Sequence, residues 1–191
     1  MNIALQDKSL DRFFVNLPKV ELHCHLLGAV TRETFADLAR RANAPISEED
    51  IARFYTRGDK PVGAIQVLRA LETHLIKTAD DLYRVAYEYL VGLPAEGVLY
   101  TEFFWNPTGT LRGSGLSYAV AQDAIVRAIR DAEKASGIIG RLVPAIDREA
   151  GAAAAVEMVQ WVVAHRVEEV VGIGIDYREE AFPPELFVEA Y

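Results

Sequence analysis

The sequence predicts an α/β fold in which about four parallel strands alternate with flanking helices. Two observations support this prediction. Short β-branched or aromatic segments of strand length alternate with longer segments of helical period along the 191 residues. Residues 170–175 are almost wholly apolar, which is typical of a strand covered on both faces. Such βαβ units build parallel sheets. An eight-stranded (β/α)8 barrel typically has about 250 residues, so the chain accounts for about half of one. A small open α/β sheet is the alternative architecture.

The strands are predicted from composition and from the residues that flank them. The first follows Pro18 and alternates along its length, and the second is rich in aromatic residues. Asn106-Pro107 ends the second strand, and a loop rich in Gly, Ser and Thr is expected after it. The predicted strands span residues 19–25, 98–104, 138–146 and 170–175.

The helices are predicted from capping residues and apolar spacing. Thr31 and Ser47 can each cap a helix, and Thr78 with Asp81 resembles a capping box. A loop is expected around Gly58 and Pro61. The predicted helices span residues 32–43, 47–54, 65–75, 79–93, 117–136 and 149–165, with another beginning after Pro184.

Composition limits the class of protein. The net charge of −8 argues against a nucleic-acid partner, which requires a basic patch. Cys24 is the only cysteine, so no intrachain disulfide can form. The start of the chain is polar, and no apolar run approaches the ~20 residues of a membrane span. We therefore expect a cytoplasmic protein without a membrane partner, and a single domain over residues 1–191.

The candidate site is the pair His23 and His25 on the first predicted strand. Residues two apart on a strand point to the same face, so both imidazoles can reach one metal ion. Cys24 faces the other way and is expected to pack as a small hydrophobe. A bare His-x-His pattern has little specificity. Its place at the end of a first strand favours a site, because barrel active sites lie at the carboxyl ends of the strands.

Residues 17–29 read Leu-Pro-Lys-Val-Glu-Leu-His-Cys-His-Leu-Leu-Gly-Ala and closely resemble the first-strand motif of the adenosine deaminase family. The likeness continues through residues 31–35, 79–89, 100–104 and 170–173. The resemblance implies a metal-dependent (β/α)8 barrel, with residues 1–191 as its N-terminal part. It also implies Zn as cofactor, with His23 and His25 as ligands, and hydrolytic release of ammonia from an aminopurine.

Several of the family's catalytic residues have no counterpart here. The family's His-Ala-Gly-Glu motif supplies a third histidine ligand and the acid–base glutamate, and a further histidine and a late aspartate follow it. None of these occurs in the sequence. His74 and His165 lie in predicted helices, where we expect solvated or packed roles. No catalytic acid or base is therefore assigned, and this chain alone is expected to bind Zn weakly and to be inactive.

The resemblance also marks candidate substrate-binding residues. Leu27 occupies the place of an acidic residue that binds ribose in adenosine deaminases, which makes adenosine doubtful and leaves a free base or another aminopurine equally compatible. Gly28 and Asp176 are the other candidates. Asp176 ends the fourth predicted strand and can equally be a turn or capping residue. The glycine that contacts the purine after this strand in the family has no counterpart here.

Two other functions are compatible with the sequence. One is a different hydrolase on the same scaffold, such as an amidohydrolase that acts on a cyclic amide. The other is a non-catalytic half-barrel that binds a purine or a partner protein. Its unpaired sheet edges would favour association into a homo-oligomer.

Overall fold

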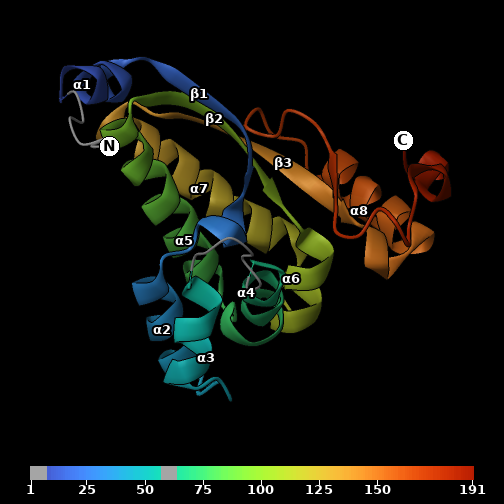
Figure 1. Ribbon diagram of the computed structural model, residues 1–191. Coiled ribbons are helices and arrows are strands. Elements are labelled where there is room, and N and C mark those ends of the chain that lie inside the picture. The colour runs from blue at the N-terminus through green and yellow to red at the C-terminus, as the bar shows by residue number, and fades with distance from the viewer. Residues whose placement is uncertain (1–7, 57–63) are drawn as a thin grey trace.

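Residues 8–56 and 64–191 are described by a computed structural model, which shows a curved parallel sheet with helices packed against it (Figure 1). The sheet is formed by β1 (Lys19–His25), β2 (Val98–Trp105), β3 (Ile139–Asp147) and β4 (Gly174–Asp176). The strands lie in the order β1-β2-β3-β4, and every pair is parallel. This half-barrel confirms the predicted α/β architecture.

The helices alternate with the strands, as predicted. They are α1 (Lys8–Asn16), α2 (Arg32–Arg41), α3 (Glu48–Tyr55), α4 (Ala64–Ala70), α5 (Ala79–Gly92), α6 (Pro107–Ser114), α7 (Tyr118–Ser136) and α8 (Ala152–Ala164). Short 3-10 or π turns occupy η1 (Leu26–Ala29), η2 (Leu71–Leu75), η3 (Leu93–Glu96), η4 (Arg148–Ala150) and η5 (Pro184–Ala190). The loop expected around Gly58 and Pro61 lies outside the described residues.

The main core lies between the sheet and helices α5 and α7. Thr101, Phe103 and Trp105 alternate on one face of β2, and all three are buried. The ring of Phe103 contacts Tyr89 of α5, and the ring of Trp105 contacts Tyr118 of α7. The other face of β2, which carries Phe104, is therefore turned away from these helices.

Helix α6 corrects the prediction of a loop after the second strand. Asn106 caps the helix by accepting a hydrogen bond from the backbone N–H of Gly109 at 3.0 Å, and Pro107 occupies the first turn. A Cβ on Gly113 would lie 1.8 Å from the backbone oxygen of Glu72. The glycines that suggested a loop instead allow α6 to pack closely on η2.

The fourth strand is shorter than predicted. Residues 170–175 were expected to be one strand, but β4 starts at Gly174, and Val170 forms only an isolated bridge to Leu142. Among the described residues β4 pairs with β3 alone, and Gly172 and Gly174 weaken an edge strand. The helix predicted from residue 149 likewise begins later, because Gly151 adopts φ 86° after η4.

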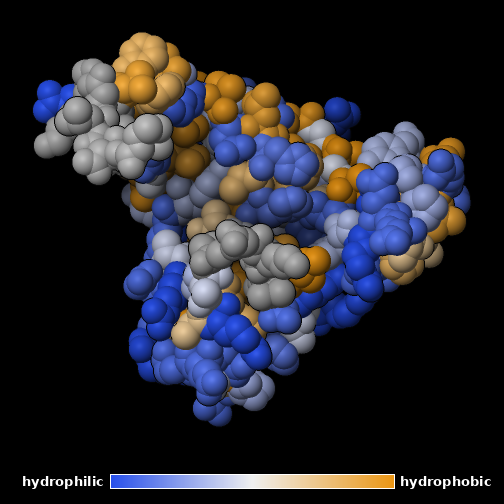
Figure 2. All heavy atoms as spheres, viewed as in Figure 1, coloured by the Kyte–Doolittle hydropathy of each residue, from blue (hydrophilic) through white to orange (hydrophobic). Residues whose placement is uncertain are grey.

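The surface of the half-barrel is unevenly polar. Figure 2 shows apolar residues over α1 and the neighbouring strands, and mostly polar residues over α2 and α3. Val20 and Leu22 of β1 and Leu99 of β2 are each more than half exposed. No helix among the described residues has the length and apolar character needed to cross a bilayer.

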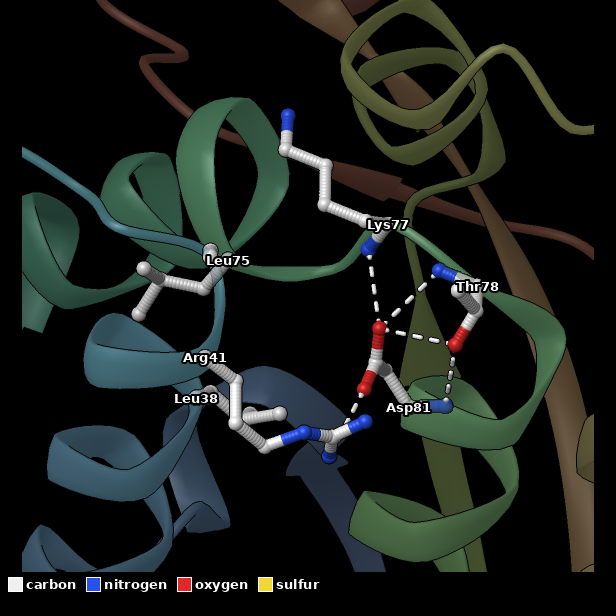
Figure 3. Close-up of a pocket in the computed structure, with 7 residues that line it drawn as sticks. Leu38, Arg41, Leu75, Lys77, Thr78 and Asp81 are labelled. Carbon is white, nitrogen blue, oxygen red and sulfur yellow. Dashed lines mark hydrogen bonds and ion pairs between the residues drawn. The ribbon is translucent and has the colours of Figure 1, made fainter.

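The start of α5 is held by a buried carboxylate, which Figure 3 shows between α2 and α5. Asp81 accepts hydrogen bonds from the hydroxyl and backbone N–H of Thr78 and from the backbone N–H of Lys77, at 2.9–3.1 Å. Arg41 of α2 forms an ion pair with the other carboxylate oxygen at 3.2 Å. The predicted capping box is confirmed, and its aspartate also ties α5 to α2.

Replacing Asp81 with Ala should lower the free energy of unfolding by about 2 kcal/mol, because a buried cap is lost and its donors are left unpaired. Asp50 of α3 is a matched control, since it makes the same capping box with Ser47 at an exposed site. Asp50→Ala should cost clearly less, because its donors stay in contact with water when the carboxylate is removed. Urea unfolding measures both. Asp50 also pairs with an arginine, Arg53, at 2.7 Å, so equal losses would show that burial adds nothing at Asp81.

Candidate functional site

The two histidines lie side by side at the carboxyl end of β1. The ring centroids of His23 and His25 are 5.3 Å apart, with their planes at 62°. Phe104 of β2 stacks on His23 at 4.5 Å and contacts His25 at 5.6 Å. The β1–β2 register places His25 opposite Phe104. The face of β2 that carries Phe104 is therefore the face of the site, a point that the sequence left open.

The spacing of the two imidazoles fits a shared metal ion. Two imidazoles bound to one tetrahedral zinc at about 2.0–2.1 Å would have ring centroids roughly 5 Å apart. The observed 5.3 Å agrees with that spacing. Neutral imidazole nitrogen is also a donor that zinc prefers. The residues present thus fit the cofactor that the sequence suggested.

Asp176 reaches His25 from the end of β4. Its carboxylate lies 3.3 Å from Nδ1 of His25, and this contact raises the pKa of His25 above its ordinary value. A carboxylate on one ring nitrogen fixes the tautomer and leaves the other nitrogen for a metal. Asp176 therefore lies within the site rather than in a remote turn.

The donor set remains incomplete within the described part of the chain. No group of three or more His, Cys, Asp or Glu side chains suited to a metal occurs there. Cys24 packs against the core, and burial raises the pKa of its thiol. His74 is exposed, and the exposed His165 contacts the ring of Tyr118, so both have the solvated or packed roles expected from the sequence.

A narrow pocket opens beside the histidines. It is lined by His25, Leu27, Leu68, Glu72, Phe104, Trp105, Asn106, Asp176 and Tyr177. Leu27 is buried in its wall, whereas Gly28 is exposed on η1 and does not line it. A Cβ on Gly174 would lie 2.3 Å from the ring of Phe104, so β4 approaches this ring too closely for a side chain. Of the three candidate substrate-binding residues, Leu27 and Asp176 line the pocket.

Glu72 of η2 brings an acidic group into the pocket that the sequence analysis did not identify. Its carboxylate accepts a hydrogen bond from Tyr177 Oη at 2.7 Å and one from Arg69 at 3.1 Å. Burial raises the pKa of Glu72 to about 7, although Tyr177 and Arg69 act in the opposite direction. Near neutral pH this group is therefore poised between its neutral and charged forms.

Arg69 links Glu72 to the ends of β3 and β4. It contacts Asp147 at 3.3 Å and Glu149 at 2.6 Å, and its guanidinium lies 3.7 Å from the ring centroid of Tyr177. Tyr177 adopts φ 70°, a left-handed conformation that is uncommon for residues other than glycine. The apolar spacing of residues 65–75 indicated a helix. That spacing did not show that the polar residues Arg69 and Glu72 of this segment would face the end of β4.

These features define the class of the protein as a parallel (β/α) half-barrel with a candidate metal site at the carboxyl ends of its strands. The chain belongs to the adenosine deaminase family, whose model matches residues 18–191.

Similar proteins agree with this assignment. An adenine deaminase from Vibrio parahaemolyticus is 30% identical over 186 residues, which cover 95% of this chain and 54% of the relative. A crystal structure of an amidohydrolase from Burkholderia ambifaria with bound Zn is 55% identical, with a TM-score of 0.95, and is matched over 100% of this chain and 52% of that chain. The chain spans about half the length of the curated relatives it matches.

An adenine deaminase from Arthrobacter aurescens supports the fold alone. Its structure has a TM-score of 0.77 at 24% identity, over 91% of this chain and 53% of that chain. The half-barrel of the described residues is therefore an arrangement found within larger relatives.

Replacing Glu72 with Gln should change how stability depends on pH. The folded-state pKa of about 7 lies above the ordinary 4.5. The native state therefore holds this proton more tightly, and the resulting stability is present below pH 4.5 and lost as the pH rises through 7. Relative to Glu72→Gln, the wild type should lose roughly 1–3 kcal/mol between about pH 5 and pH 8. Urea unfolding across this range measures it, and a difference independent of pH would contradict the raised pKa.

Proposed function

We propose that this chain takes part in zinc-dependent hydrolytic deamination of an aminopurine, with release of ammonia. The observation that carries the proposal is the histidine pair, whose ring spacing suits one metal ion in a member of the adenosine deaminase family. The similarity to an adenine deaminase supports the reaction, and the similarity to a zinc-bound amidohydrolase supports the metal.

In this proposal His23 and His25 hold the zinc, which when bound lowers the pKa of a water toward neutrality. Asp176 orients His25 through the contact at 3.3 Å, as a carboxylate partner of a metal-binding histidine does. Phe104 contacts both rings and restricts their rotation. Asp176 and Phe104 together preorganise the two imidazole donors.

Leu27 shapes the substrate side of the pocket. It is buried beside His25 and offers no acceptor to a ribose hydroxyl. Gly28, the next residue, is exposed and leaves the neighbouring surface without a side chain. A free base or a non-ribosyl aminopurine therefore suits this wall better than adenosine does.

We assign no acid–base catalyst to these 191 residues. Two imidazoles are fewer than the three protein ligands usual for catalytic zinc. Neither His74 nor His165 lines the pocket. In our proposal the third ligand and the proton donor come from outside this chain, which forms the N-terminal part of a hydrolase barrel and is inactive alone.

The protein is produced at the length that its native source makes. Replacing both His23 and His25 with Ala in it should remove bound zinc and reduce ammonia release at least 100-fold. His74→Ala is the matched control, because this histidine is exposed and outside the pocket. Metal analysis and an ammonia assay with adenine and other aminopurines give the two readouts. Continued deamination by the double variant would refute the proposal.

The similarity to an amidohydrolase also favours a second candidate, hydrolysis of a cyclic amide at the same site. The two functions share the zinc and differ in the bond that breaks. A panel of aminopurines and cyclic amides separates them. If the protein releases ammonia from an aminopurine and leaves the cyclic amides intact, deamination is supported. If it opens a cyclic amide and releases no ammonia, the alternative is supported.

A further inference from the structure

The carboxylate that contacts His25 is held by few interactions within the sheet. Asp176 is the last residue of β4, a strand of three residues that, in the described part of the chain, pairs with β3 alone. The register places Asp176 opposite Asp147, so two buried carboxylates end neighbouring strands, where like charges repel each other. The contact between Asp176 and His25 at 3.3 Å therefore requires support from outside the sheet.

Tyr177, the next residue, supplies this support through its side chain. Its hydroxyl donates a hydrogen bond to Oε1 of Glu72 at 2.7 Å, and burial raises the pKa of Tyr177, which keeps the proton on the donor. The guanidinium of Arg69 lies 3.7 Å from the centroid of the tyrosine ring. A hydrogen bond to a carboxylate and a cation–π contact are both sensitive to geometry. Tyr177 thus joins the end of β4 to α4 and η2.

The backbone of Tyr177 indicates that these two contacts fix its conformation. Its φ of 70° lies in the left-handed region, which costs a residue other than glycine about 1–3 kcal/mol. A residue retains such a conformation only when its surroundings enforce it. The hydrogen bond to Glu72 and the stacking on Arg69 offset this cost. Because Asp176 precedes Tyr177 directly in the chain, the same contacts restrict the position of the Asp176 carboxylate.

The two groups that hold the tyrosine are themselves fixed. Arg69 forms ion pairs with Asp147 at 3.3 Å and with Glu149 at 2.6 Å, which tie it to the end of β3. Glu72 is 2% exposed and accepts a second hydrogen bond from Arg69 at 3.1 Å. A Cβ on Gly109 of α6 would lie 2.6 Å from the Glu72 carboxylate, so α6 restricts the rotation of this group. The tyrosine is therefore anchored on a rigid part of the fold.

We propose that Tyr177 is a positioning residue for the metal site. It holds Asp176 against Nδ1 of His25 and thereby strengthens the binding of zinc. This inference rests on the proposed function, in which His25 is a zinc ligand. A carboxylate that orients a metal-binding imidazole contributes roughly 10–100-fold to metal affinity. Tyr177 acts through that carboxylate, and its role requires no contact of its own with the metal or with the reacting atoms.

Zinc affinity measured without substrate tests this assignment. The protein is produced at the length that its native source makes, and the dissociation constant of zinc is measured by competition with a chelator. Tyr177→Phe removes the hydroxyl and keeps the ring on Arg69, so it should weaken zinc binding by about 3-fold or more. Asp176→Ala removes the carboxylate itself and should weaken zinc binding by roughly 10–100-fold.

The double variant separates positioning from a general loss of structure. If Tyr177 acts through Asp176, adding Tyr177→Phe to Asp176→Ala should change zinc affinity by less than about 2-fold, because the group to be positioned is already gone. Tyr100→Phe is the matched control, since Tyr100 also donates to a glutamate at 2.7 Å but does not line the pocket, and it should bind zinc as the wild type does. Should Tyr177→Phe not fold, Glu72→Leu removes the acceptor at similar volume and is used with the same expected losses.

The outcomes distinguish this inference from the proposed function. Wild-type zinc affinity in Tyr177→Phe, or additive losses in the double variant with Asp176→Ala, would overturn the positioning role and leave zinc-dependent deamination intact. Absence of zinc binding by the wild type would overturn both. A loss in Tyr177→Phe that disappears when Asp176 is absent would support both.

Discussion

The parallel pairing of β1 with β2 is the interaction on which both the core and the site depend. Its register sets Cys24 opposite Phe103 and His25 opposite Phe104. Because strand side chains alternate, one set enters the core beneath α5 and α7 and the other faces the pocket. A shift of one residue would bury the histidines and expose the core residues. The same hydrogen bonds thus stabilise the fold and bring two imidazoles within reach of one ion.

A second constraint is the close approach of glycine-containing segments around the pocket. Gly174 lets β4 approach the ring of Phe104, and Gly109 lets the carboxylate of Glu72 rest against the first turn of α6. These contacts bring groups from η2, α6 and β4 around one small space beside His25. Arg69 balances part of the acidic charge that gathers there. The pocket is therefore a product of packing between elements distant in the sequence.

Because the pocket arises from packing between distant elements, the sequence predicted the elements better than it predicted the pocket. Strands and most helices follow from local signals, such as the capping box of Thr78 and Asp81 and the alternation around His23 and His25. Helix α6 was missed because its glycines serve tertiary packing against Glu72, which no local pattern reveals. Glu72 was missed as a pocket residue for the same reason. Asp176 was identified only through resemblance. β1 and β4 are the two edge strands of the described sheet, and the curvature of the sheet brings the end of β4 to His25.

The most direct measurement is zinc-edge X-ray absorption on the protein isolated from its native source. If His23 and His25 hold the metal, the spectrum should show imidazole nitrogens at about 2.0–2.1 Å, and the His23→Ala and His25→Ala double variant should lose at least this part of the signal. A zinc ion without imidazole ligands, or a spectrum unchanged in the double variant, would contradict the assignment of the site to the end of β1.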